Sequence, residues 1–162
     1  MSMICDLFAV PADTLRRLMD DPSGVHEVLE SLEGTEANAC LEKSWHGLHF
    51  AFTRTSWGGA PPLDFLAAGG APVGTEDVGY GPARALEPAA VVELNAALGR
   101  FTEAEFDRNF DLVELDREEI YPQIWDEPLE DLREEYLNYL NHLTALVRRA
   151  AGRGEALLVT IR

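Results

Sequence analysis

The two ends of the chain constrain its fold more than any other feature, because each carries a short apolar run. Residues 3–10 are mostly apolar on both alternating faces and stop at Pro11, which is typical of a short central strand. Asp6 is the one charged residue of that run. Residues 156–161 form a second apolar run. We therefore expect the two ends to supply strands that pair centrally in one sheet.

Most of the intervening chain is predicted to be helical. Apolar residues recur there at helical spacing, and prolines, glycines and a capping box lie where helices would begin and end. These patterns predict helices over residues 12–20, 22–32, 44–53, 88–99, 102–110 and 128–152. Residues 54–81 are rich in glycine and proline and should form a long ordered connection, with a short helix over 63–67.

The number and order of the predicted helices and strands indicate the α+β class. Residues 83–86 can form a third short strand, and the helices outnumber the strands without alternating with them one for one. We expect an α+β fold with a single compact domain over residues 1–162. Its small sheet should have about three strands, near 3–10, 83–86 and 156–161, covered by about six helices.

The chain is strongly acidic, with a formal net charge of −16 at pH 7. Such a field repels phosphate backbones and anionic lipids and attracts basic surfaces, so we expect no nucleic-acid partner and no membrane partner. Residues 111–135 hold eleven acidic and two basic residues, and the resulting local charge of −9 is more than half of the total. A solvated helix face accounts for most runs of this kind. The alternative and more specific interpretation is an acidic surface that docks a basic protein.

Cysteine content and hydropathy indicate the compartment. Cys5 and Cys40 are too few for a disulfide framework, and Cys5 lies in an apolar run where a buried thiol is the usual occupant. No basic residue precedes Arg16, although a signal peptide would require one, and no run approaches the roughly 18 uninterrupted apolar residues of a membrane helix. We expect a soluble, cytoplasmic protein.

Residues 43–50 read Lys-Ser-Trp-His-Gly-Leu-His-Phe and place two histidines beside a tryptophan in a stretch that must be partly buried. As a helix, this segment is capped by Ser44 and carries Trp45 on an apolar stripe. His46 and His49 then share one face, whereas a strand would point them to opposite faces. We favour the helix, because the apolar positions match its period.

The two histidines do not form a recognised catalytic or metal motif. Two imidazoles are only half of a usual zinc shell, and no HExxH or CxxC accompanies them, so we expect no metal and no cofactor. Cys40 with His46 lacks a third catalytic group placed by the sequence. Asp77 would make an acid–base pair with His46 or His49 only if the fold brought them together. Structural or hydrogen-bonding histidines are the favoured interpretation.

Residues 74–81 are rich in glycine but do not resemble a phosphate-binding loop. They lack the Gly-Lys-Ser/Thr ending and the third glycine of a dinucleotide turn, and Glu76 and Asp77 would repel phosphate. Tight turns explain the glycines around Tyr80. Arg84 follows in a chain that is mostly acidic, and an arginine in such a chain usually binds a carboxylate. We expect an internal ion pair, and a carboxylate of a ligand is the alternative.

Residues 121–126, Tyr-Pro-Gln-Ile-Trp-Asp, contain no standard catalytic arrangement. Pro122 restrains Tyr121 to an extended conformation and Pro128 opens the next helix, so both aromatic residues of this stretch lie on a stiff connection. Tyr121 and Trp125 can pack the connection against the domain, or they can anchor a partner, since Tyr and Trp dominate the binding energy of many interfaces.

Three stretches together resemble a known family. Residues 43–50, 79–84 (Gly-Tyr-Gly-Pro-Ala-Arg) and 120–125 (Ile-Tyr-Pro-Gln-Ile-Trp) occur in this order, between a Met-Ser-Met-Ile start and a short apolar strand at the other end. The ordered set resembles the YfbM-like family, a bacterial domain family of unknown function, over the whole chain. The resemblance implies a compact, cytoplasmic α+β domain, and it transfers no reaction, ligand or catalytic residue.

Two functional hypotheses from different classes follow, and no motif fixes whether the protein is an enzyme. The first is a binding or interaction protein whose acidic surface docks a basic protein partner, as an antitoxin-like or immunity-like protein would. The second is a small enzyme or ligand-binding protein with a pocket around His46, His49, Asp77, Tyr80 and Arg84. We favour the first, because the charge imbalance is a property of the composition itself. The candidate binding residues are Trp45, His46, His49, Asp77, Tyr80, Arg84, Tyr121, Trp125 and Asp126.

Overall fold

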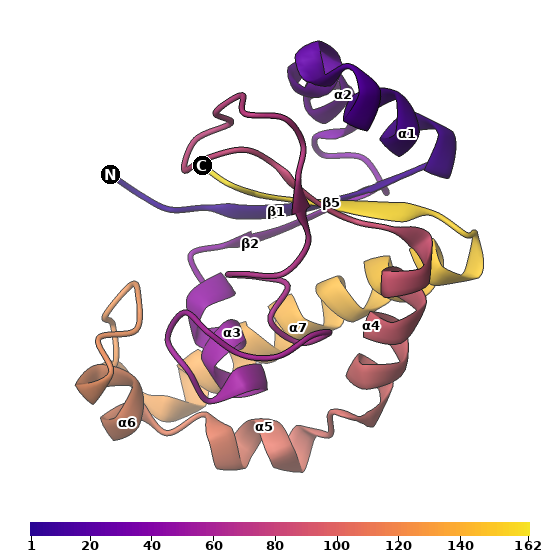
Figure 1. The fold of residues 1–162 in the computed structure, drawn as a ribbon. Helices are drawn as coiled ribbons and strands as arrows, with labels where there is room; N and C mark the ends of the chain where they lie inside the picture. Colours follow the sequence, from indigo (N-terminus) through magenta and orange to yellow (C-terminus); the bar gives the residue numbers. More distant parts are fainter.

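A computed structural model describes residues 1–162, and at its centre the two ends of the chain pair as expected. β1 (Cys5–Val10) and β5 (Ala156–Ile161) run antiparallel, with Cys5 opposite Ile161 and Val10 opposite Ala156. Three further strands complete an open antiparallel sheet in the order β2-β1-β5-β4-β3 (Figure 1): β2 (Asn38–Glu42), β4 (Arg84–Leu86) and β3 (Ala71–Pro72).

The expectation of about three strands is wrong, because the sheet has five. β2 escapes sequence analysis since its residues, Asn-Ala-Cys-Leu-Glu, are only weakly apolar and bury alternate side chains. β3 is two residues long and includes Pro72, which is tolerated at a sheet edge. The predicted strands over 3–10 and 83–86 each begin slightly later, at Cys5 and Arg84.

Seven α-helices surround the sheet, one more than expected: α1 (Ala12–Asp20), α2 (Val25–Leu32), α3 (Trp45–Thr53), α4 (Pro88–Arg100), α5 (Glu103–Asn109), α6 (Leu112–Arg117) and α7 (Leu129–Gly152). A short 3-10 turn, η1 (Pro22–Gly24), precedes α2. The unexpected helix is α6, which begins where the Asp111 carboxylate accepts two backbone N–H groups. The predicted capping box of Thr102 and Glu105 is present at α5. Residues 61–68 are turns, so the short helix expected over 63–67 does not form.

Helices cover both faces of the sheet, which explains why β1 and β5 are apolar throughout. Leu7 and Val159 belong to a large core with α3, α4 and α7, whereas Phe8 and Leu158 belong to a smaller core with α1 and α2 (Figure 1). Because successive side chains of a strand alternate between faces, both faces must be apolar. None of the helices combines the length and apolarity needed to cross a bilayer.

Asp6, the charged residue of the first apolar run, is buried and paired. Its carboxylate accepts hydrogen bonds from Nε of Arg162 at 3.0 Å and from Nδ2 of Asn38 at 3.1 Å. Arg162 also donates to Glu33 at 2.5 Å, just after α2. A carboxylate out of water is costly unless it is paired in this way. The pair therefore connects the last residue of the chain to the first strand.

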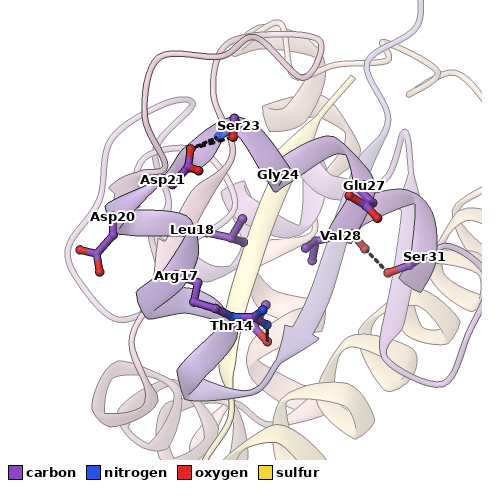
Figure 2. Close-up of a pocket in the computed structure, with 10 residues that line it drawn as sticks. All are labelled: Thr14, Arg17, Leu18, Asp20, Asp21, Ser23, Gly24, Glu27, Val28 and Ser31. Atoms are coloured by element: carbon purple, nitrogen blue, oxygen red, sulfur yellow. Dashed lines mark hydrogen bonds between the residues drawn. The ribbon is translucent and has the colours of Figure 1, made fainter.

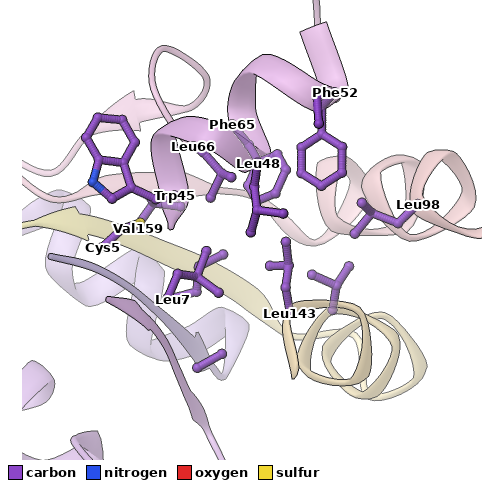
Figure 3. Close-up of a cluster of buried hydrophobic side chains, with 14 of the residues drawn as sticks. Cys5, Leu7, Trp45, Leu48, Phe52, Phe65, Leu66, Leu98, Leu143 and Val159 are labelled. Carbon is purple, nitrogen blue, oxygen red and sulfur yellow. The ribbon is translucent and has the colours of Figure 1, made fainter. Parts of the chain in front are cut away.

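α3 lies deep in the large core, where every residue from Trp45 to Phe52 is buried. Figure 3 shows Leu48 and Phe52 of this helix close to Leu98 of α4 and Leu143 of α7. Gly47 lets α3 approach α7 closely, because a methyl group there would lie 2.5 Å from a ring carbon of Tyr136. Only glycine permits this contact without displacing an aromatic ring.

We expect Gly47→Ala to lower the free energy of unfolding by about 1–3 kcal/mol, because the added methyl group would overlap the Tyr136 ring. Gly99→Ala in α4 is the matched control. No neighbouring atom lies within 4 Å of its added methyl group, so the better helix propensity of alanine should raise the free energy of unfolding by up to about 1 kcal/mol. Urea denaturation followed by circular dichroism measures both. Equal effects would contradict the close packing of α3 against α7.

Candidate functional site

The helix predicted for the histidine-containing segment is present as α3, but its cap is not the expected one. Ser44 has helical backbone angles, and its hydroxyl donates to the Leu41 carbonyl at 2.6 Å instead of accepting an N–H group of the first turn. The helix ends at Arg54, which adopts the left-handed conformation with φ 60°. The chain then turns back over α3 through residues 55–60.

His46 joins two loops that are far apart in the sequence. Its Nε2 lies 2.7 Å from the Ser56 carbonyl, and its Nδ1 accepts the Tyr121 N–H at 3.0 Å. Because a carbonyl only accepts and an N–H only donates, Nε2 carries the proton and the ring is neutral. Burial lowers the pKa of His46, which favours this neutral form. Both ring nitrogens are occupied, so His46 is a structural linker in this state.

An aromatic cluster of Trp45, His46, Trp57 and Tyr121 forms around this link. The Trp57 ring lies 4.4 Å from the His46 ring and 5.9 Å from the Trp45 ring, centroid to centroid. Trp45 donates its indole N–H to the Met3 carbonyl, and the Tyr121 hydroxyl accepts the Met3 N–H, each at 3.1 Å. Trp57 is 57 % exposed and forms the outer face of the cluster.

Trp57 is a candidate that sequence reasoning missed. It lies in a stretch rich in glycine, serine and threonine, which is typical of a connection, and no periodic pattern includes it. The tight positive-φ turn at Arg54 and the carbonyl of Ser56 place its ring against His46. An isolated tryptophan in a long ordered connection was the available signal.

The acidic segment (residues 116–135) lies next to this cluster, since the Ser56 hydroxyl is 3.5 Å from the Glu118 carbonyl. Most of its carboxylates are exposed and form no ion pair or hydrogen bond with the rest of the protein. They are Asp116, Glu119, Asp126, Glu127, Glu130, Asp131, Glu134 and Glu135. Only Glu118 is paired, with Arg117 at 3.2 Å. Arg133, the other base of the segment, binds Glu103 and Asp107 of α5.

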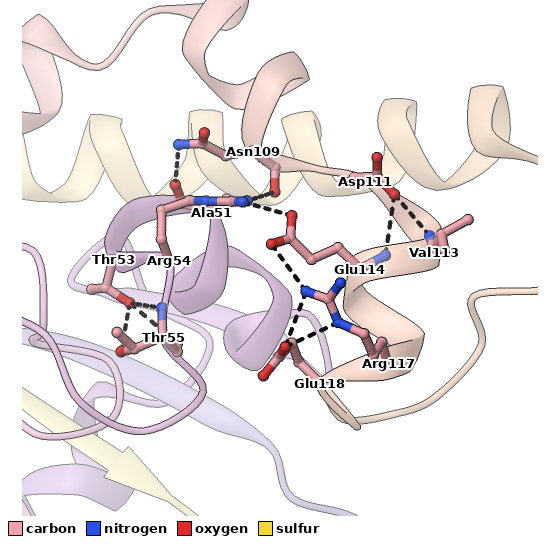
Figure 4. A network of polar contacts seen from close by, with 10 residues as sticks. All are labelled: Ala51, Thr53, Arg54, Thr55, Asn109, Asp111, Val113, Glu114, Arg117 and Glu118. Carbon is pink, nitrogen blue, oxygen red and sulfur yellow. Dashed lines mark hydrogen bonds and ion pairs between the residues drawn. The ribbon is translucent and has the colours of Figure 1, made fainter.

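A polar network fixes the start of the acidic segment against α3 (Figure 4). Arg54 donates to the Glu114 carboxylate at 2.6 Å and to the Asn109 carbonyl at 3.1 Å. Asn109 in turn donates to the Ala51 carbonyl at 2.8 Å. Arg117 lies 3.6 Å from the same Glu114 carboxylate. These contacts engage the nearby arginines and leave the carboxylates beyond them without a basic partner.

Trp125 and Asp126 differ in accessibility although they are adjacent. Trp125 is buried, donates its indole N–H to the Ile120 carbonyl at 2.7 Å and packs 5.9 Å from the Tyr136 ring. It therefore holds the connection against α7. Asp126 is exposed and unpaired. Trp57, and not Trp125, is therefore the solvent-exposed tryptophan next to the acidic segment.

His49 is fully buried on α3 and is less well satisfied than His46. Its Nε2 lies 3.3 Å from the Thr53 hydroxyl, and its Nδ1 has no hydrogen-bond partner. Burial, assisted by the neighbouring His46, lowers the pKa of His49 from 6.5 to about 4. The ring is consequently neutral at pH 7.

Asp77 and Tyr80 lie on an exposed loop. The Asp77 carboxylate accepts the N–H groups of Gly79 at 2.7 Å and Gly81 at 3.0 Å, which lowers the pKa of Asp77. The Tyr80 N–H donates to the Ile161 carbonyl at 2.8 Å, so the loop lies along the end of β5. Asp77 makes no contact with either histidine within hydrogen-bond distance.

The ion pair expected for Arg84 is absent, so that expectation is wrong. The guanidinium donates instead to backbone carbonyls of the turn before β3: those of Phe65 at 2.9 Å, Leu66 at 2.8 Å, and Gly69. No carboxylate lies within ion-pair distance, although Asp64 is near enough to attract the charge. Clustered carbonyl dipoles replace the carboxylate as the partner of this half-buried cation.

The principal cavities of the molecule do not involve the predicted site residues. One of them, of about 640 Å³, is a groove between α1 and α2 (Figure 2). Its polar groups bind one another, for example Arg17 to Thr14 and Ser23 to Asp21. No group of three or more His, Cys, Asp and Glu side chains is arranged to hold a metal ion. The predicted residues therefore do not line one cavity: Trp45, His46 and His49 are buried on α3, whereas Asp77 and Tyr80 lie on a separate exposed loop.

Comparisons with known proteins agree with this fold. A family model described as "Domain of unknown function (DUF1877)" matches residues 1–160. Among solved structures, the chain is similar to a protein of unknown function, YfbM from Escherichia coli, with 22 % sequence identity and a TM-score of 0.74. The match covers 98 % of this chain and 99 % of that chain. At this identity the likeness concerns the fold alone. No curated protein matches the chain.

The buried His49 predicts an acid-sensitive fold. Its pKa is lower in the folded state than in the unfolded state. The contribution of the neutral His49 ring to the free energy of unfolding is therefore complete above about pH 6.5 and is lost as the pH falls towards 4. We expect His49 to account for a loss of about 2 kcal/mol in the free energy of unfolding between pH 7 and pH 4.5. His49→Gln should reduce that loss, as measured by urea denaturation at both pH values. An identical loss in the two proteins would refute the assignment.

Proposed function

We propose, from the premise that this chain belongs to the DUF1877 family of domains of unknown function, that it is an interaction protein whose acidic segment docks a basic protein. The predicted YfbM-like resemblance is confirmed, and the family supplies no reaction or ligand. The observation that carries the proposal is the set of eight exposed carboxylates in residues 116–135 that lack any basic partner within the chain.

Charge supports this proposal in two ways. The net charge of −16 attracts a basic protein from a distance, and the unpaired carboxylates concentrate that attraction at α6, the following connection and the first turns of α7. The carboxylates are exposed to solvent ions, so the steering force should weaken as the salt concentration rises and the Debye length falls below the ~8 Å of physiological ionic strength. The partner is expected to present lysines and arginines.

Trp57 supplies the apolar part of the proposed surface. A single electrostatic contact between exposed groups contributes little affinity, whereas a tryptophan that becomes buried contributes much more. The Trp57 ring packs against the His46 ring in a tilted arrangement, which restrains it, so little side-chain entropy is lost when a partner covers it. We infer that Trp57 is the anchor and that the carboxylates of the acidic segment form the rim.

The concrete form of the partner that we propose is a basic toxin, which the domain would neutralise as an antitoxin or immunity protein does. A reducing, cytoplasmic location is part of the same proposal, and the two unbridged cysteines are compatible with it. The alternative, a ligand pocket, remains a prediction with less support. Four of its five residues already bind neighbouring groups: His46, His49, Asp77 and Arg84.

Charge reversal within the acidic segment should abolish most partner binding. The change is Glu119→Lys, Glu130→Lys and Asp131→Lys together, which raises the net charge from −16 to −10 because each reversal adds two units. Affinity for the partner recovered from the native cells should fall on the order of 30- to 100-fold at low salt. Native mass spectrometry identifies the partner, and biolayer interferometry measures the affinity.

The matched control reverses three unpaired acids at the other face of the sheet: Asp20, Glu27 and Glu30. It also gives a net charge of −10, so it separates the position of the charge from its amount. We expect the control to retain most of its affinity. A loss as large as that of the first variant, or no stoichiometric protein adduct in the wild type, would contradict the proposal.

Trp57→Ala should weaken partner binding by about 2 kcal/mol, or roughly 30-fold, because the anchor is removed while the charge is unchanged. Tyr80→Ala is the comparison, since Tyr80 is also a half-exposed aromatic residue but belongs to the alternative pocket. Under the interaction proposal its affinity stays near that of the wild type. The reverse ranking of the two variants would favour the alternative.

A further inference from the structure

A second acidic site lies away from the acidic segment, between the turn of residues 61–70 and the first half of α4. It is a cavity of about 370 Å³ whose lining includes Asp64, Glu87 and Glu93. No Lys, Arg or His lines it. The remaining wall has no charged side chain and consists of Pro61, Pro62, Gly69, Gly70, Ala85, Leu86, Ala89, Ala90 and Leu94. The cavity thus combines apolar walls with three carboxylates.

Asp64 is the unusual member of this lining. The residue is only 8 % exposed, and the cation nearest to its carboxylate, Arg84, attracts it without lying within ion-pair distance. The backbone carbonyl of Asp64, by contrast, accepts the N–H groups of Ala67, Ala68 and Gly69. The residue as a whole is nine-tenths buried, but its carboxylate oxygens are not among the fully enclosed polar atoms and are open to the cavity that Asp64 lines. A carboxylate that is open to a cavity and has no protein partner is free to receive a cation.

Arg84 makes the wall rigid without neutralising it. Its guanidinium is engaged by the carbonyls of Phe65, Leu66 and Gly69, and it attracts Asp64 only at longer range. The turn that holds Asp64 is consequently fixed before any ligand arrives. A fixed carboxylate binds a cation with little loss of conformational entropy.

The arrangement favours an organic cation over a metal ion. No three acidic side chains converge closely enough to coordinate a metal, so the carboxylates are spread along the cavity. The positive end of the α4 dipole and the charge of Arg84 further reduce the negative field. A single positive charge on an apolar stem fits such a site, because the stem contacts the apolar wall while the charge reaches Asp64.

We propose that this cavity binds an alkylammonium group, carried either by a free diamine or by a lysine side chain, with Asp64 as the carboxylate that receives it. Glu87 and Glu93 have no ion-pair partner and lie at the exposed part of the lining, where they attract the ligand. The site shares no residue with the acidic segment, so it does not depend on the function proposed above.

Isothermal titration calorimetry with 1,4-diaminobutane at low salt tests the proposal. We expect the wild type to bind, and Asp64→Asn to weaken binding at least about ten-fold, because the amide keeps the shape and loses the charge. Asp20→Asn, which removes one exposed carboxylate from α1, should leave the affinity unchanged. The uncharged analogue 1,4-butanediol should not bind.

Ala89→Phe provides a second variant that does not alter charge. Ala89 is exposed on α4 and lines the cavity, so the larger side chain should obstruct the site without disturbing the core, and we expect a comparable loss of affinity. The triple reversal of Glu119, Glu130 and Asp131 should bind the diamine as the wild type does at physiological salt.

A glycine-rich peptide with one lysine and blocked ends distinguishes the two sources of the ligand. Binding of the free diamine supports a small-molecule ligand, whereas binding of the peptide alone supports a lysine presented by a protein. The absence of binding by either probe at millimolar concentration would overturn the proposal. Binding that Asp64→Asn and Ala89→Phe leave unchanged would also overturn it.

Discussion

The antiparallel pairing of β1 with β5 is the interaction on which the rest of the structure depends. It brings the two ends of the chain together at the centre of the sheet, and the ion pair of the buried Asp6 with Arg162 joins them at one end of the ladder. Because this ladder has helices on both faces, every other element is positioned relative to it. Residues 11–155, which lie between the two strands, supply the rest of both cores and both proposed sites.

Arginines in this acidic chain act mainly within the protein. Arg162 binds Asp6 and so connects the two ends of the chain. Arg84 donates to backbone carbonyls in the turn of residues 61–70, and Arg54 joins α3 to α6. Arg133 similarly connects α7 to α5. Each of these contacts uses a positive charge that would otherwise screen nearby carboxylates. The surplus of negative charge therefore appears as unpaired groups on the surface, where it can act on another molecule.

Much of the fold follows from local patterns in the sequence. The terminal strands, α4 with Pro88 at its start, the Thr102 capping box and the long α7 were all predictable, since each has a strong apolar period or a specific boundary residue. β2 and β3 were not, because β2 is only weakly apolar and β3 is two residues long and includes Pro72. α6 was hidden by the surrounding acidic residues.

The site was less predictable than the fold. The link from Ser56 through His46 to Tyr121 depends on loop geometry that no periodicity encodes, and it is this link that presents Trp57. The hydrogen-bond acceptors of Arg84 were also unpredictable, because every residue has a backbone carbonyl and the sequence does not show which of them the fold brings to the guanidinium. The excess of carboxylates in residues 111–135 is visible in the sequence, because net charge is a matter of counting, whereas the pairing of each carboxylate depends on the fold.

Hydrogen–deuterium exchange of the protein with and without its isolated partner tests the central claim most directly. The account predicts that protection on binding is concentrated in residues 116–135 and in the connection of residues 54–58 that carries Trp57. The groove between α1 and α2 should exchange at the same rate in both states. Protection confined to that groove, or to the loop of residues 74–81, would contradict the account.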